Sequence, residues 1–158
     1  MQEKLTMMKL DLDLPKRDHV AIMKKSWGLL PKILSGKKTI ESRWYMNRIA
    51  PWDQIDAGDT VYFKDAGEPV TLKANVSKVL QFQALNKNKA IKILEEYGGE
   101  IGMEPSKKNI DWCAKRNYCI LVFLEEPLKL EPFNIDKTGY GNACAWLVTP
   151  DINDLTVR

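Results

Sequence analysis

Short strand-like segments separated by turn residues constrain the fold of this chain most strongly. Six segments alternate in apolar character or form short apolar runs: residues 19–24, 39–45, 60–64, 70–82, 118–123 and 144–148. The turn sequence Ala66-Gly67-Glu68-Pro69 joins the third segment to the fourth. This order favours strands linked by hairpins over alternating βαβ units.

Helical spacing of apolar residues appears between and beside these segments. The expected helices and their boundary residues are a helix capped by Ser26 and ended by Gly36, a helix over 90–97 ended by Gly98-Gly99, and a helix from Ser106 through Arg116. Together the patterns predict an α+β fold, a closed or nearly closed mixed β-barrel of five or six strands with peripheral helices.

The length of 158 residues suggests a single domain. We place it at residues 19–150, after a flexible N-terminal leader at 1–18 and before a loose polar tail at 151–158. The leader mixes charges and lacks the apolar block of a signal peptide. Apolar runs elsewhere are too short to span a bilayer, so we expect a cytoplasmic protein with no membrane contact.

Cysteine and histidine usage narrows the chemistry. The three cysteines, Cys113, Cys119 and Cys144, are odd in number and form no C-x-x-C pair, which favours a reducing compartment. The single histidine, His19, opens a predicted strand, and a structural role is expected for it. These residues lack metal-ligand spacing, so neither a metal site nor a cofactor is expected.

Positive charge is concentrated in one segment. Residues 24–48 carry seven Lys or Arg side chains against Glu41 alone, a net charge of +6, whereas the whole chain carries +3. Such a concentration is typical of a polyanion site, although a solvated basic face is the common alternative. Trp27, Trp44 and Tyr45 lie among these charges, and nucleic-acid bases stack on such rings.

The most informative segment is Gly36-Lys37-Lys38-Thr39-Ile40-Glu41-Ser42-Arg43. On a strand, Glu41 and Arg43 share one face, and Ile40 points the other way as a core anchor. Lys38 is expected at the mouth of a cleft, with its stem over the same face. Arg43 could hold a phosphate through two parallel hydrogen bonds and Glu41 could accept a base amino group, but the residues alone favour a structural ion pair modestly.

The spacing of Gly36, Lys38, Glu41 and Arg43 resembles the G-x-K-x-x-E-x-R signature of ASCH domains. A second stretch, Gly58-Asp59-Thr60-Val61-Tyr62-Phe63, is similar to the G-D-x-V-x-F sequence that follows it in that family. The resemblance covers roughly residues 20–82. It implies a PUA-like barrel with a cleft beside the motif strand.

The resemblance also implies two kinds of function. Related folds bind RNA, often at modified bases, whereas some ASCH proteins act as nucleases or as acetylcytidine amidohydrolases that use a Lys and a Thr. Glu41 stands here where those amidohydrolases have the threonine, and Thr39 is displaced by two positions. Lys38 is the residue carried over without change.

We therefore expect a cleft that binds RNA or a modified nucleotide. Its ligand-binding residues are predicted as Lys24, Trp27, Lys38, Glu41, Arg43 and Trp44. The alternative is a metal-independent hydrolase, a ribonuclease or modified-nucleoside amidohydrolase, in which Lys38 stabilises developing negative charge and Glu41 is the general base. A third interpretation is a protein-interaction domain that uses its basic face.

Overall fold

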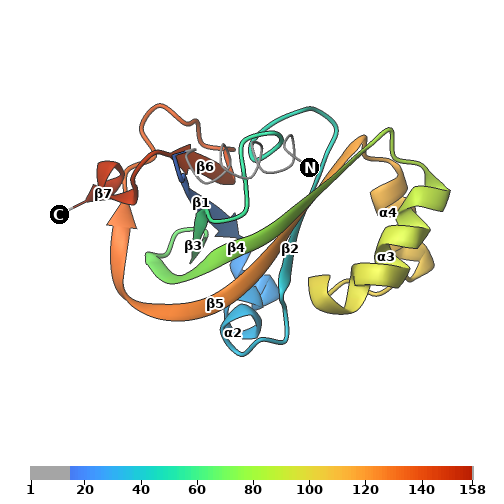
Figure 1. The fold of residues 1–158 in the computed structure, drawn as a ribbon, viewed down its shortest axis with the longest axis horizontal. Helices are drawn as coiled ribbons and strands as arrows, with labels where there is room; N and C mark the ends of the chain where they lie inside the picture. The colour runs from blue at the N-terminus through green and yellow to red at the C-terminus, as the bar shows by residue number, and fades with distance from the viewer. Residues whose placement is uncertain (1–14, 158) are drawn as a thin grey trace, which may run out of the picture.

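The computed structural model describes residues 15–157, and in this part of the chain one mixed sheet dominates (Figure 1). Its strands are β1 (Asp18–Met23), β2 (Ile40–Tyr45), β3 (Thr60–Asp65), β4 (Val70–Gln83), β5 (Tyr118–Ile135), β6 (Trp146–Thr149) and β7 (Thr156–Val157). The strand order is β2-β5-β4-β3-β1-β6, with β7 paired to the end of β5. The sheet curls into a half-barrel, which confirms the predicted α+β fold with a mixed barrel and peripheral helices.

The connections mix hairpin and crossover geometry. Strands β3 and β4 form the predicted antiparallel hairpin across the turn at 66–69. Strand β1, however, pairs in parallel with β3 and antiparallel with β6, so the sheet joins both ends of the chain. Strands β2 and β6 are the two edges of the sheet. These two edge strands do not pair with each other, and we call the gap between β2 and the β1–β6 pair the seam. Side chains must close it.

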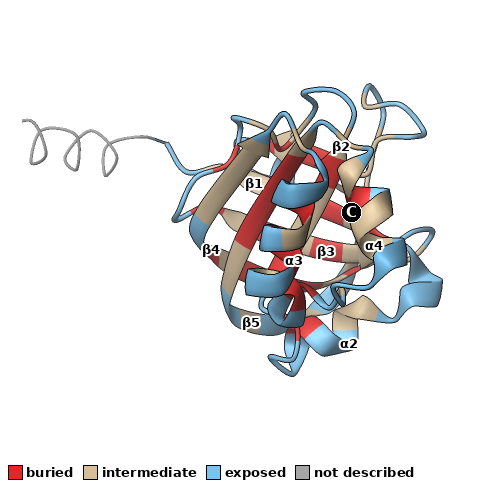
Figure 2. Ribbon diagram, turned by 90° about the vertical axis from the view of Figure 1, so that its right-hand side faces the viewer, coloured by how far each residue is buried: buried red, intermediate tan, exposed pale blue. Residues whose placement is uncertain are grey.

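Helices flank the sheet, and the two longest lie together at one end of the half-barrel (Figure 2). Their bounds are η1 (Lys25–Trp27), α2 (Leu29–Leu34), α3 (Lys87–Ile101), α4 (Lys107–Ala114) and η2 (Ile152–Asp154). Side chains cap three of them, because Asn86 accepts from the Lys89 amide, Ser106 from the Asn109 amide and Asp151 from the Asn153 amide. Helices α3 and α4 pack on each other, and α3 also contacts β2.

Two local predictions of helix ends were wrong. Ser26 lies inside η1 and Gly28 precedes α2, so the expected cap is absent. Gly98 and Gly99 lie within α3 instead of ending it, and a Cβ at Gly98 would meet the Met103 carbonyl oxygen at 2.5 Å. The helix ends at Gly102, which takes the left-handed conformation with φ +84°.

Strand β5 is three times as long as the apolar run at 118–123 indicated. It continues through Pro127 to Ile135 because β4 pairs with it as far as Phe133. Strand β2 pairs only with its first part, up to Phe123. Beyond Phe123 the edge opposite β4 is free of β2, and a proline is tolerated on an edge. The polar sequence there reflects exposure, which the apolar pattern could not distinguish from a loop.

The chain after Pro150 packs on the domain, contrary to the expected loose tail at 151–158. Ile152 and Leu155 are buried, and Thr156 pairs with Ile135. At the other end, Asp18 opens β1 and its carboxylate accepts from the Ile152 amide at 2.8 Å. The packed domain therefore runs from Asp18 to Val157, whereas residues 1–14 of the expected leader lie outside the described residues.

Two apolar cores position the motif strand. One fills the half-barrel and the other lies between β2, β5 and the helices α3 and α4. Ile40 belongs to the second core and is 1% exposed, as predicted for an anchor. No helix in the described residues is long and apolar enough to cross a bilayer.

Candidate functional site

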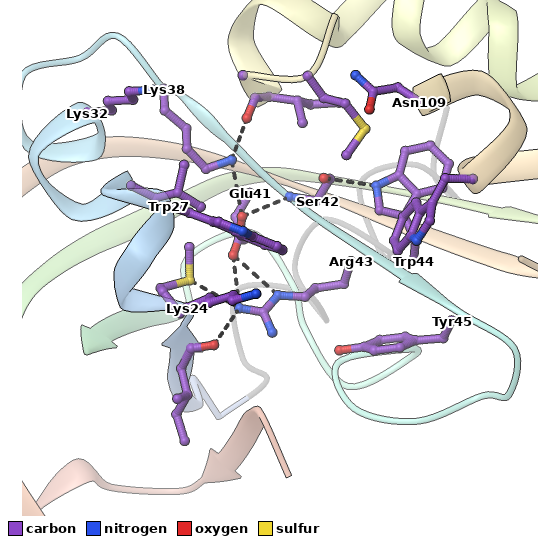
Figure 3. A pocket seen from close by; sticks show the side chains of 17 residues that line it. Lys24, Trp27, Lys32, Lys38, Glu41, Ser42, Arg43, Trp44, Tyr45 and Asn109 are labelled. Atoms are coloured by element: carbon purple, nitrogen blue, oxygen red, sulfur yellow. Dashed lines mark hydrogen bonds and ion pairs between the residues drawn. The ribbon is translucent and has the colours of Figure 1, made fainter. Parts of the chain in front are cut away.

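The motif strand β2 is placed by the turn that precedes it. Gly36 takes φ +81° after α2, and the Lys38 amide donates to the Lys32 carbonyl at 3.0 Å. The Thr39 amide then donates to the Glu100 carbonyl at the end of α3. Because Ile40 packs under the helices, the alternation of the strand directs Glu41 and Arg43 toward the seam (Figure 3). We call Lys38, Glu41 and Arg43 the charged triad.

Lys38 is buried, with 3% of its surface exposed, so the predicted position at the mouth of the cleft was wrong. Its Nζ donates to the carbonyl oxygens of Ile40 and Ile101, both at 2.7 Å, and lies 3.1 Å from Glu41 Oε1. An ammonium has three N–H donors, and these contacts use all three. The stem folds inward because α3 ends directly above β2.

Glu41 is also buried and is held from both sides. Oε1 faces Lys38 and accepts from the Ser42 amide at 3.2 Å, while Oε2 accepts from Arg43 Nε at 3.2 Å and Nη2 at 2.9 Å. Burial raises the pKa of this carboxyl, but the charges of Lys38 and Arg43 outweigh burial and hold the pKa below its ordinary value. Glu41 is therefore a carboxylate at neutral pH with its four acceptor positions filled.

Arg43 closes the seam between β2 and the β1–β6 pair. The Nε–Nη2 edge faces Glu41, Nη1 donates to the Ala145 carbonyl at 3.3 Å, and Nη2 also approaches the Ile22 carbonyl at 3.4 Å and Met23 Sδ at 3.2 Å. The two-pronged edge expected to hold a phosphate is thus occupied by Glu41.

A buried network supports Arg43 from behind. The guanidinium lies over the Trp146 ring at 5.0 Å, Trp146 Nε1 donates to His19 Nδ1 at 3.0 Å, and His19 Nε2 lies 2.9 Å from Asp59 Oδ2. An indole N–H only donates, so Nδ1 must be the acceptor and Nε2 carries the proton that goes to Asp59. The structural role predicted for His19 is therefore that of a link from Asp59 to the triad.

Asp59 is the fixed end of this network. It accepts from the backbone amides of Arg17 and Asp56 in addition to His19. Burial raises the pKa of Asp59, but these hydrogen bonds outweigh burial and the pKa lies below its ordinary value. The Gly58-Asp59 pair that resembled a family motif thus anchors the support of the site.

A pocket of about 490 Å³ opens above the triad along the edge strand β2. All six residues predicted to bind a ligand line it: Lys24, Trp27, Lys38, Glu41, Arg43 and Trp44. Trp27 is 62% exposed at the rim with Lys24 Nζ 5.6 Å from its ring, whereas Trp44 is 7% exposed and donates to Ser42 Oγ. The structure brings the predicted residues together, and their roles stay predictions.

Sequence reasoning missed the wall that comes from the helical end. Gly102 and Met103 after α3, and Asn109 and Trp112 on α4, also line the pocket, as do Lys32 and Tyr45. Trp112 is 43% exposed, with the Arg116 guanidinium 4.1 Å from its ring. A tryptophan exposed on a short, basic helix was the available signal, but the sequence did not show which face of α4 meets β2.

The basic segment divides in the structure. Lys24, Lys32, Lys38 and Arg43 face the pocket with Glu41, a net charge of +3 around the cavity. Lys25 instead pairs with Glu68 at 2.6 Å, and Arg48 covers the rings of Trp52 and Tyr118. Positive charge at the site is therefore real but smaller than the count along the chain.

No cysteine of the described chain lines the pocket. Cys113 and Cys119 are buried free thiols, and burial raises the pKa of Cys113 to about 11. Among residues 15–157 no three His, Cys, Asp or Glu side chains gather closely enough to hold a metal ion. Metal-independent function stays a prediction.

The depressed pKa of Glu41 should make the free energy of unfolding depend on pH. The folded pKa of Glu41 is depressed, so its stabilising contribution is complete above the unfolded value of about 4.3 and is lost as pH falls through the lower folded value. We expect the gap in unfolding free energy between the wild type and Glu41→Gln to be constant from pH 7 to 5 and to shrink below about pH 4. Urea titrations at each pH measure the gap, and a gap unchanged at the lowest pH would contradict this assignment.

The described part of the chain has a PUA-like α+β fold with a pocket along its edge strand β2. The crystal structure of ASCH from Zymomonas mobilis superposes on it with a TM-score of 0.61 and 16% identity, covering 89% of this chain and 96% of that chain. Two mutant forms of the same protein superpose with TM-scores of 0.60 and 0.61, at 16% and 17% identity, over 89% and 84% of this chain and 99% and 88% of theirs. The chain therefore has an ASCH-like fold, as the motif predicted.

No family model and no curated protein sequence matches the chain. At 16–17% identity the structural likeness establishes the fold. Function must be argued from the side chains of this chain.

Proposed function

We propose that the pocket binds one unpaired nucleotide of a single-stranded RNA. The observation that carries the proposal is the pocket itself: a cavity of about 490 Å³ with a net charge of +3, walled by four aromatic rings. Ligand pockets for small molecules have volumes of about 300–1,000 Å³, a range that includes a nucleoside. The rings are Trp27, Trp44, Tyr45 and Trp112.

The charges have separate tasks in this proposal. Lys38 and Arg43 are committed to Glu41 and to backbone carbonyls, so they shape the floor of the pocket. Lys24 and Lys32 are exposed at the rim, where their amines can meet phosphates without breaking an internal bond. Base stacking on exposed Trp27 and Trp112 supplies the remaining contact.

The hydrolase alternative receives less support from the geometry. A general base should have a pKa near the working pH, whereas the pKa of Glu41 lies below its ordinary value. Lys38 has no N–H left for a developing negative charge. Catalysis by this pair would require the triad to break, so we expect short RNAs and acetylated nucleosides to remain intact after long incubation with pure protein.

The proposal is tested by fluorescence anisotropy with a labelled single-stranded RNA. Trp27→Ala should weaken binding about 5- to 150-fold, as expected for the loss of one stacking contact worth about 1–3 kcal/mol. Lys24→Ala should weaken it and reduce the slope of log Kd against log salt by about 0.7, the value for one phosphate contact on a single strand. Lys129→Ala, an exposed lysine on β5 outside the pocket, is the matched control.

Two outcomes would contradict the proposal. Binding that does not change across a salt series would exclude phosphate contacts. Equal losses in Lys24→Ala and Lys129→Ala would show diffuse attraction by the whole surface, and the pocket would then have no special part in it.

A further inference from the structure

Arg116 stands beside the pocket, directly after the C-terminal end of α4. Its backbone amide donates to the Cys113 carbonyl at 3.0 Å and so continues the last turn of that helix. The guanidinium carbon lies 4.1 Å from the centre of the Trp112 ring. Trp112 lines the pocket and Arg116 does not, so the guanidinium lies next to the cavity and not inside it.

The other arginines of the described chain are already engaged. Each of three donates to a side chain of this protein: Arg17 to Asp56, Arg43 to Glu41 and Arg48 to Gln83. Within residues 15–157, no ion pair or side-chain hydrogen bond accompanies the contact of Arg116 with Trp112. Stacking holds the planar guanidinium against the ring, and its N–H donors lie in the plane of the group, where a ligand meets them. The two-pronged donor expected of Arg43 is therefore present at Arg116.

The helix that carries Trp112 is basic. Residues 107–116 hold three exposed lysines and Arg116 against Asp111 alone, a net charge of +3. Asn109 and Trp112 line the pocket from this helix, and Lys24 lines it from the residue that follows β1. In Figure 3, Lys24 and Asn109 lie on opposite sides of β2. A nucleic-acid strand whose base enters the pocket thus meets positive charge on both sides of the cavity.

We propose that Arg116, held flat on Trp112, binds the phosphodiester next to the nucleotide that occupies the pocket. A guanidinium holds two phosphate oxygens through parallel N–H donors, whereas an ammonium acts as a point charge. The site then extends beyond the pocket and takes a strand of linked nucleotides, with one phosphate at the lysines of the rim and another at Arg116. The inference rests on the nucleotide binding proposed above and adds a second subsite to it.

The test is an anisotropy titration of fluorescein-labelled oligo(U) across a salt series. Arg116→Ala should weaken binding about 10-fold or more, as expected for one charge-assisted contact, and reduce the slope of log Kd against log salt by about 0.7. Arg116→Lys keeps the charge but loses the planar donor pair, so the slope should recover while the affinity stays reduced. Lys115→Ala, which removes the exposed lysine one residue earlier, is the matched control and should change the affinity by less than about twofold, because its charge is screened by solvent and salt.

Competition by unlabelled uridine separates a phosphate contact from a structural role of Arg116. Uridine has no phosphate, so its inhibition constant should be the same for the wild type and Arg116→Ala. Weaker inhibition by uridine in Arg116→Ala would show that Arg116 acts by placing Trp112, and would overturn the inference.

The remaining outcomes distinguish the subsite from the function on which it rests. Equal affinities of Arg116→Ala and Lys115→Ala, with binding still weakened in Trp27→Ala, would overturn the phosphate subsite and leave the nucleotide pocket standing. Full recovery of affinity in Arg116→Lys would overturn the subsite too, because charge alone would then account for the contact. Unchanged binding in both Trp27→Ala and Arg116→Ala would remove the proposed function and the subsite together.

Discussion

Replacing Glu41 with alanine should lower the free energy of unfolding by about 3–5 kcal/mol, the usual cost of removing one partner from a buried ion pair. The carboxylate stands between two cations, with Lys38 Nζ 3.1 Å and Arg43 Nη2 2.9 Å away. Without it two like charges remain in a buried site and repel each other. Urea unfolding followed by circular dichroism measures the change.

Lys38→Met is the matched control for this change. Methionine is close to lysine in length but carries no charge, so the substitution removes one cation and leaves the Glu41–Arg43 pair with no net charge. The expected cost is about 1–3 kcal/mol, because the carbonyls of Ile40 and Ile101 lose their donor. If Lys38→Met destabilised the protein more than Glu41→Ala, Glu41 would not be the centre of the network.

Trp146→Ala should cost about 3–5 kcal/mol, since the ring is 2% exposed in the core of the half-barrel. Its loss also removes the surface under Arg43 and the donor to His19 Nδ1. Trp146→Phe separates these contributions, because it keeps most of the ring and removes the N–H. We expect about 1–3 kcal/mol for that substitution, the cost of an unpaired buried acceptor.

Trp27→Ala is the comparison for Trp146. Trp27 is 62% exposed and should change the unfolding free energy by less than about 0.5 kcal/mol. A large loss of stability in Trp27→Ala would show that the rim of the pocket is part of the core. In that case its effect on RNA binding could not be read as the loss of a stacking contact.

Local sequence signals predicted the parts of the fold that depend on local periodicity. Alternation along 39–45 placed Ile40 in a core and Glu41 with Arg43 on the opposite face, because strand parity fixes both at once. The turn at 66–69 predicted the β3–β4 hairpin in the same way. These features need no knowledge of distant parts of the chain.

Features that depend on distant contacts could not be predicted. The position of Lys38 is decided by the end of α3, where the Ile101 carbonyl accepts from Nζ across 63 residues of sequence. The support of Arg43 joins His19 to Trp146 across 127 residues. The sequence gives no sign that these residues meet. They come together at the seam because β1 pairs in parallel with β3 and antiparallel with β6.

The five tryptophan side chains offer the most direct measurement of the central claim, that the pocket above the triad is the nucleic-acid site. Each indole N–H gives one ¹⁵N-¹H correlation, assigned by single Trp→Phe substitutions. During titration with oligo(U), the signals of Trp27, Trp44 and Trp112, which line the pocket, should shift and saturate with one Kd. Trp52, which packs against Tyr118 outside the pocket, should stay in place. Shifts at Trp52 with unchanged signals from Trp27 and Trp112 would contradict the account.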